Sequence, residues 1–220
     1  MIETDISLVW FDWYHFAFEL SFAVISLVIA LFALKIYKAT DQRPAKLLSL
    51  AFFSISSAYI VQTIFNFLII KNLDDDVGGM INLSSAAVLD TIGLYFHIFF
   101  MVIGLVILLY MALKLKSTRV FWILLAISFT ALIFSREPII AYYFISALYL
   151  AVISWHYIEN FLSNKQTKTL LIAIAFIFLF IGSFHFFLSV NHNLFIVIGH
   201  FLELAAYILI LINFYLVLKK

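Results

Sequence analysis

Apolar residues run along nearly the whole chain and are interrupted at intervals by clusters of charged and turn-forming residues. Crossing ~30 Å of hydrocarbon takes about 20 apolar residues in helical form, because intra-helix hydrogen bonds satisfy the backbone where water is absent. The interruptions leave seven such segments, at roughly 12–37, 46–70, 89–113, 120–134, 139–161, 169–190 and 194–218. The fourth is the shortest. Since most connections are short, we predict a single seven-helix domain over residues 1–220.

The composition agrees with an all-α, polytopic integral membrane protein. Of the 220 residues, 66% are hydrophobic and 11% are charged, which excludes a soluble domain with a polar surface. The lipid bilayer is the predicted partner, and nucleic acid is not. The chain has no cysteine, so any metal would be bound by histidine and carboxylate. The opening residues are acidic and aromatic rather than basic, so no cleavable signal peptide is predicted.

Basic residues gather in alternate connections. Eleven of the 13 Lys and Arg residues follow the first, third, fifth and seventh segments. The other connections contain Lys71 and Arg136, and eight of the 12 acidic residues lie on that same side. Because short loops rich in Lys and Arg stay on the cytoplasmic side, we predict an outer N-terminus and a cytoplasmic C-terminus in the cell membrane.

Ionisable side chains inside the segments concentrate near the predicted outer surface. At ~1.5 Å per helical residue, Glu19, His97, His200 and Glu203 lie roughly 9 to 14 Å below it. Ionisable groups within hydrocarbon cost several kcal/mol unless they are paired or face a polar cavity. With His185 nearer the surface on a further segment, four helices contribute costly groups at similar depth, which favours a ligand-binding or proton-handling site over separate interhelical hydrogen bonds.

The spacing of these residues sharpens the prediction. His15 and Glu19 are four residues apart and His200 and Glu203 are three apart, so each pair projects from one helix face. If the helices form a sequential ring, the first and last are neighbours, and the third could lie centrally. The predicted ligand- or metal-binding residues are His15, Glu19, His97, His185, His200 and Glu203, and the polar groups expected around them are Gln62, Asn66, Asp90 and Tyr95.

Several functions are compatible with such a site. The leading hypothesis is a sensor or binding module whose outer cavity holds a divalent metal, a haem or a small ligand; histidines on two facing helices would suit haem. A membrane hydrolase is the first alternative, with zinc on His97, His185 and His200 activating water. A proton-coupled small-solute transporter is the second, with His156 and Glu159 as the inner exit.

A faint internal repeat relates the first three segments to the last three. His97 and His200 precede the closing Lys114 and Lys219 by 17 and 19 residues, in segments that run in the same predicted direction. Such a three-one-three layout is similar to that of the SWEET-type sugar transporters. Those proteins, however, carry prolines inside their helices, and this chain has none within its spans.

Two stretches carry a further resemblance. They are HFAFELSFAVISLVIALFALKIYKATDQRPAKLLSLAFF, from His15 to Phe53, and GHFLELAAYILILINFYLVLKK, from Gly199 to Lys220, about a quarter of the chain. They resemble a loose class of prokaryotic seven-helix modules that often form the membrane input part of sensor proteins. The resemblance implies a sensory or signalling role, with His15, Glu19, His200 and Glu203 as matching positions. Output would then require a cytoplasmic or membrane signalling partner.

Overall fold

Seven α-helices make up the part of the chain that the structure describes. The computed structural model describes residues 3–75, 83–189 and 193–218. Its helices are α1 (Glu3–Thr40), α2 (Arg43–Asp75), α3 (Leu83–Ala112), α4 (Thr118–Ile133), α5 (Pro138–Asn164), α6 (Thr167–Leu188) and α7 (Asn193–Leu218). The all-α prediction is confirmed for these residues.

Six of these helices are long and apolar enough to cross a membrane, which supports a multi-pass membrane protein. The exception is α4, which has 16 residues and is apolar but short. That α4 also crosses stays a prediction. The longest predicted connection, 71–88, is shorter than expected, because α2 continues to Asp75 and α3 begins at Leu83.

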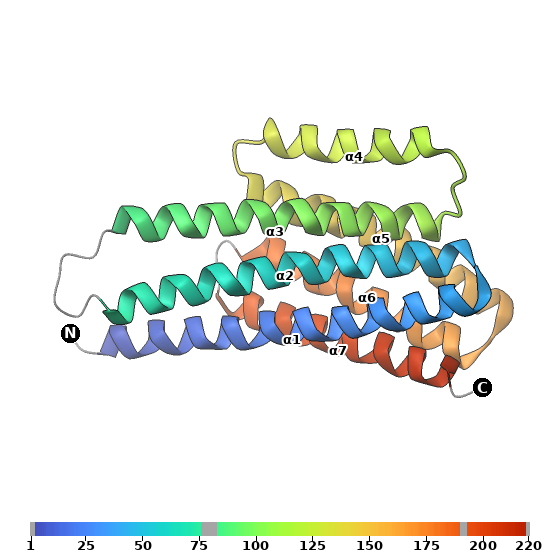
Figure 1. Cartoon of the computed structure of the whole chain (residues 1–220), viewed down its shortest axis with the longest axis horizontal. Coiled ribbons are helices and arrows are strands. Elements are labelled where there is room, and N and C mark those ends of the chain that lie inside the picture. Colours follow the sequence, from blue (N-terminus) through green and yellow to red (C-terminus); the bar gives the residue numbers. More distant parts are fainter. Residues whose placement is uncertain (1–2, 76–82, 190–192, 219–220) are drawn as a thin grey trace.

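The six long helices form a closed ring in the order α1, α2, α3, α5, α6, α7, with α1 against α7. In the described part of the chain, α4 lies outside this ring and contacts α3 and α5 (Figure 1). The predicted proximity of the first and last helices is confirmed, but the central position expected for the third helix is wrong. Exposed apolar side chains on α3, such as Phe96 and Phe99, suit a wall position facing lipid.

The ring consists of two three-helix halves, α1–α2–α3 and α5–α6–α7. In each half the middle helix packs closely on both of its neighbours, and the halves meet along two narrower seams, α1/α7 and α3/α5. A two-fold rotation that places α1 on α5 and α3 on α7 exchanges these seams. The order of the helices therefore agrees with the three-one-three layout expected from the sequence.

Buried serines and small residues hold neighbouring helices together. The hydroxyls of Ser49 and Ser56 donate to carbonyl oxygens of α1 at 3.0 and 2.9 Å, and Ser54 donates to the Phe100 carbonyl of α3 at 2.7 Å. A Cβ added at Gly104 would lie 3.0 Å from the Ala51 carbonyl oxygen, so α2 and α3 approach closely there. Lipid tails are as apolar as leucine, so close packing and such hydrogen bonds stabilise the bundle.

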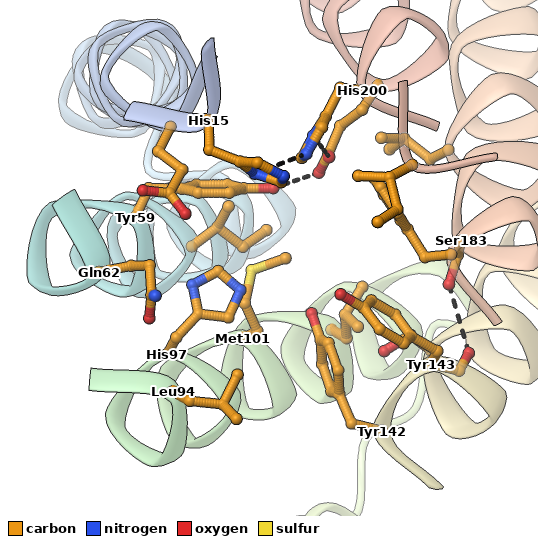
Figure 2. A pocket seen from close by; sticks show the side chains of 18 of the residues that line it. His15, Tyr59, Gln62, Leu94, His97, Met101, Tyr142, Tyr143, Ser183 and His200 are labelled. Atoms are coloured by element: carbon orange, nitrogen blue, oxygen red, sulfur yellow. Dashed lines mark hydrogen bonds and ion pairs between the residues drawn. The ribbon is translucent and has the colours of Figure 1, made fainter. Parts of the chain in front are cut away.

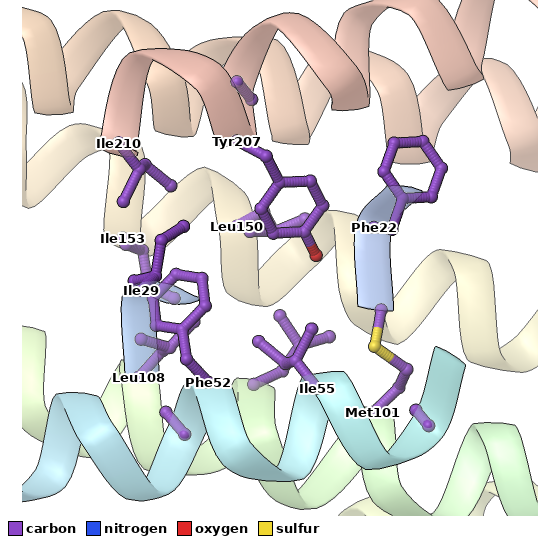
Figure 3. Packing of buried hydrophobic residues seen from close by; sticks show 14 of the residues in the cluster. Phe22, Ile29, Phe52, Ile55, Met101, Leu108, Leu150, Ile153, Tyr207 and Ile210 are labelled. Carbon is purple, nitrogen blue, oxygen red and sulfur yellow. The ribbon is translucent and has the colours of Figure 1, made fainter. Parts of the chain in front are cut away.

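A core of apolar side chains fills the ring toward the end opposite the N-terminus. Phe52, Leu108, Ile153 and Ile210 are almost fully buried there and come from α2, α3, α5 and α7 (Figure 3). The buried ionisable side chains Glu19, His200 and Glu203 lie nearer the N-terminal end than this core.

The predicted orientation can be tested with introduced cysteines, because the chain contains none. Ser117 precedes α4 and Ser135 follows it, so the two serines lie at opposite ends of α4. In intact cells, Ser135→Cys is expected to react with a membrane-impermeant maleimide, and Ser117→Cys is expected to react only after permeabilisation. The opposite pattern would reverse the orientation, and labelling of both variants in intact cells would contradict a crossing by α4.

Candidate functional site

A cavity of 580 Å³ lies inside the ring and is lined by all six long helices. Along α3 its lining positions run from Ala87 to Leu108, a rise of about 30 Å at ~1.5 Å per residue. Near the N-terminal end the walls carry carboxylates, amides and imidazoles, whereas the inner walls are apolar. The apolar end is formed by Leu105, Leu108, Leu150 and Leu179.

Most of the residues predicted for the site line this cavity. They are His15, Glu19, His97, His200 and Glu203, together with Gln62, Asn66 and Asp90. Glu19, His200 and Glu203 are each only 9% exposed, which places them well inside the bundle. The structure therefore brings together groups that lie up to 188 positions apart in the chain, as the common depth of these residues suggested.

Two predicted members of the site lie elsewhere. His185 does not line the cavity; its Nδ1 lies 2.8 Å from the Ile181 carbonyl oxygen, and its ring packs against Phe195. Tyr95 is 54% exposed on the outer face of α3. Depth along a helix can be counted from the sequence, but the face that a residue occupies depends on which neighbours the helix packs against.

The predicted inner proton exit is also separate from the cavity. Glu159 is exposed and accepts a hydrogen bond from Trp155 Nε1 at 2.8 Å, one turn earlier on α5. The His156 ring packs edge-on against Tyr157. Neither His156 nor Glu159 lines the cavity, so within the described residues this pair lies apart from the group that does.

A histidine pair closes the seam between α1 and α7. His200 Nε2 lies 3.2 Å from His15 Nδ1, with one of the two nitrogens donating, and the rings are almost perpendicular at 84° (Figure 2). Phe18, Phe22 and Phe186 surround the His200 ring. His200 Nδ1 is buried, has no hydrogen-bond partner and lies 4.0 Å from Glu203 Oε2.

Two carboxylates of the cavity, Glu19 and Glu203, accept hydrogen bonds from neutral donors. Tyr59 donates its hydroxyl proton to Glu203 Oε1, which links α2 in one half to α7 in the other (Figure 2). Asn66 Nδ2 donates to Glu19 Oε2 at 2.6 Å, and Gln62 Nε2 donates to Asn66 Oδ1 at 3.3 Å. This chain of amides leaves the buried Gln62 Oε1 without a partner. Each carboxylate therefore keeps oxygen lone pairs available to a further donor.

The wall opposite α2 is built from residues that the sequence analysis did not single out. Tyr142, Tyr143 and Ser146 come from α5, and Ser183 comes from α6 and donates to the Tyr143 carbonyl oxygen at 3.3 Å (Figure 2). Tyr59 was also missed. A signal was present on α2, since Ile55, Tyr59, Gln62 and Asn66 recur at three- and four-residue spacing and so share one helix face.

Equivalent positions of the two halves line the cavity. Asp90, Leu94, His97 and Met101 on α3 correspond to Ile196, His200, Glu203 and Tyr207 on α7, each 106 positions later. On α2, Ile55, Tyr59 and Gln62 correspond to Leu179, Ser183 and Phe186 on α6, each 124 positions later. Gly93 and Gly199 are also 106 positions apart, and each packs against a phenylalanine of the preceding helix. The two halves thus share a helix register but differ in side-chain chemistry.

The described side chains do not form a recognisable metal site. Among the described residues, no three His, Asp or Glu side chains are grouped so that they could hold a metal ion. His185 lies away from His97 and His200, so the predicted zinc site is not assembled. His15 and His200 contact each other directly, which leaves no room for a haem iron between them.

The hydrogen bond from Tyr59 to Glu203 should contribute to stability. In Tyr59→Phe the buried Glu203 loses its donor, and an unsatisfied buried acceptor costs about 1–3 kcal/mol. We expect thermal unfolding in detergent to shift down by roughly 2–4 °C for each kcal/mol lost. The matched control is Tyr215→Phe, at a 60% exposed position of α7, which should leave the midpoint unchanged. Equal midpoints for Tyr59→Phe and wild type would contradict a structural role for this bond.

No protein-family model, no curated protein and no solved structure matches this chain. What the cavity binds has to be inferred from the side chains that line it.

Proposed function

We propose that this protein is a membrane binding module of the sensor type, which recognises a small ligand in the cavity between its six long helices. The observation that carries the proposal is the convergence of polar groups from α1, α2, α3 and α7 at one end of a 580 Å³ cavity. Ligand sites are typically cavities of this size, with mostly apolar walls and a few polar groups that orient the ligand.

The unpartnered atoms in the cavity support ligand binding over a purely structural role. Buried polar groups in proteins are nearly always hydrogen-bonded, and each exception calls for an explanation. His200 Nδ1 and Gln62 Oε1 are buried without a partner in the described structure, and both residues line the cavity. A bound ligand would satisfy such atoms. In a sensor, binding at this end would alter how the helices pack toward the predicted cytoplasmic end, where a signalling partner reads the change.

A thermal-shift screen of the purified protein tests ligand binding. The probes are metal ions, haem, and small anionic, neutral and cationic compounds, and a ligand at 100 times its Kd stabilises the folded state by about 2.7 kcal/mol. We expect at least one class to raise the unfolding midpoint of wild type by several degrees. His97→Asn/His200→Asn should lose this shift, and the control His156→Asn, outside the cavity, should keep it.

An unchanged shift in the double variant would place the ligand elsewhere. A screen in which no class stabilises wild type would contradict the binding module itself.

Transport is a second candidate, and the two-half architecture favours it. Parallel repeats related by an axis along the membrane normal are common in transporters, where substrate binds between the repeats and the halves rock about it. Here the cavity lies between α1–α2–α3 and α5–α6–α7, which meet along narrow seams. Phe52 separates this cavity from a smaller one of 200 Å³ nearer the opposite end, and it lines both. Movement of Phe52 would join the two.

Cysteine accessibility distinguishes transport from sensing. Ser146 is buried in the cavity wall, and Ser154 is equally buried two turns further along α5 but does not line the cavity. If the halves alternate, Ser146→Cys will react with a membrane-impermeant thiol reagent added from either side of oriented vesicles. In a receptor it will react from the N-terminal side alone. Ser154→Cys, the control, should stay protected from both sides.

A further inference from the structure

We infer that the ligand of this cavity is an organic cation, whose ammonium group binds among the carboxylates while its apolar body points toward the inner leucines. The inference rests on the proposed function, since it names the class of compound that the cavity takes. Three observations support it. They are the charge of the side chains that line the cavity, the buried polar atoms near His200 and Glu203 that lack a hydrogen-bond partner, and the arrangement of the aromatic rings.

The described side chains that line the cavity are acidic on balance, since they include Glu19, Asp90 and Glu203 but no Lys or Arg. Glu19 and Glu203 receive hydrogen bonds from Asn66 and Tyr59, which are neutral. A carboxylate or phosphate on the ligand would therefore meet like charges without a counter-ion, whereas a cation would be attracted in a site of low dielectric constant.

The atoms that lack partners are placed to receive N–H groups. His200 is 9% exposed, and its unpartnered Nδ1 lies 4.0 Å from Glu203 Oε2. That separation is too long for a direct hydrogen bond. When His200 Nε2–H donates to His15 Nδ1, Nδ1 is an acceptor, so one ammonium group can donate to Nδ1 and to Oε2. Gln62 Oε1 is a further unpaired acceptor in the same cavity.

Aromatic rings complete an environment for a cation with an apolar body. Tyr59, Tyr142, Tyr143 and Phe186 line the cavity, and ring faces attract ammonium groups within about 6 Å. Further along, Leu105, Leu108 and Leu150 offer only apolar contacts. A ligand with a charged end and an apolar end therefore has one favourable orientation, with the ammonium toward the N-terminal end of the bundle.

The test compares three compounds of nearly equal shape: phenethylamine, the neutral phenethyl alcohol and the anionic phenylacetate. Binding to the full-length protein in nanodiscs is measured by calorimetry at neutral pH. We expect the amine to bind at least tenfold more tightly than the alcohol, and phenylacetate to give no heat. Glu203→Gln and Glu19→Gln should each weaken amine binding at least tenfold. Glu159→Gln, which removes an exposed carboxylate outside the cavity, should leave it unchanged.

Two results would overturn the inference and leave the binding module standing. The first is that the alcohol or phenylacetate binds as tightly as the amine. The second is that neither Glu19→Gln nor Glu203→Gln weakens binding of the amine. If none of the three compounds binds, the cation inference is wrong. The proposed function is contradicted as well only if no class of compound stabilises the protein in the thermal-shift screen.

The ammonium group recognised in cells can belong to a soluble amine or to a lipid headgroup. Nanodiscs of phosphatidylethanolamine will compete with phenethylamine if the headgroup is bound, and nanodiscs of phosphatidylglycerol will not. Equal amine affinity in both lipids indicates a soluble amine. Either result supports recognition of an ammonium group.

Discussion

The hydrogen bond between Tyr59 and Glu203 is the constraint on which the rest of the site depends. A carboxyl group inside an apolar bundle is costly unless a donor serves it, and the donor comes from α2, a helix with no direct backbone contact to α7 among the described residues. The bond therefore spans the cavity and ties one half of the ring to the other. A ligand that donates to Glu203 Oε2 shares this carboxylate with Tyr59, which donates to Oε1, so ligand occupancy and the relative position of the halves become linked.

The two halves repeat one backbone arrangement but carry different side chains, and this explains why the two sides of the cavity differ. His97 and Glu203 occupy equivalent positions, as do Tyr59 and Ser183, while Gln62 corresponds to Phe186. Two identical halves would present the same groups twice around the axis and would hold a ligand in two equivalent orientations. Here the amides come from α2 alone, so a ligand meets different chemistry on each side.

The helices and the common level of the polar group along the bundle followed from the sequence, because hydrocarbon imposes a fixed helix length and a high cost on ionisable residues. The face that each residue occupies did not. In water an apolar stripe marks the buried side of a helix, but in lipid both sides are apolar. His97 therefore lines the cavity and Tyr95, two residues earlier, faces outward, although both were predicted to belong to the site. The wall position of α3 and the place of α4 outside the ring were equally hidden, because they depend on which helices pack together.

The two-half architecture also explains why the chain contains the short helix α4. Three helices bring the chain to the end opposite its start, so a second half in the same orientation needs one more passage before α5 can begin. Figure 1 shows α4 making that passage on the outside of the ring. Its 16 residues extend about 24 Å, several Å less than the hydrocarbon thickness. If α4 crosses the bilayer as predicted, local thinning would meet such a mismatch at modest cost. Because α4 lines no part of the cavity, that cost would fall outside the site.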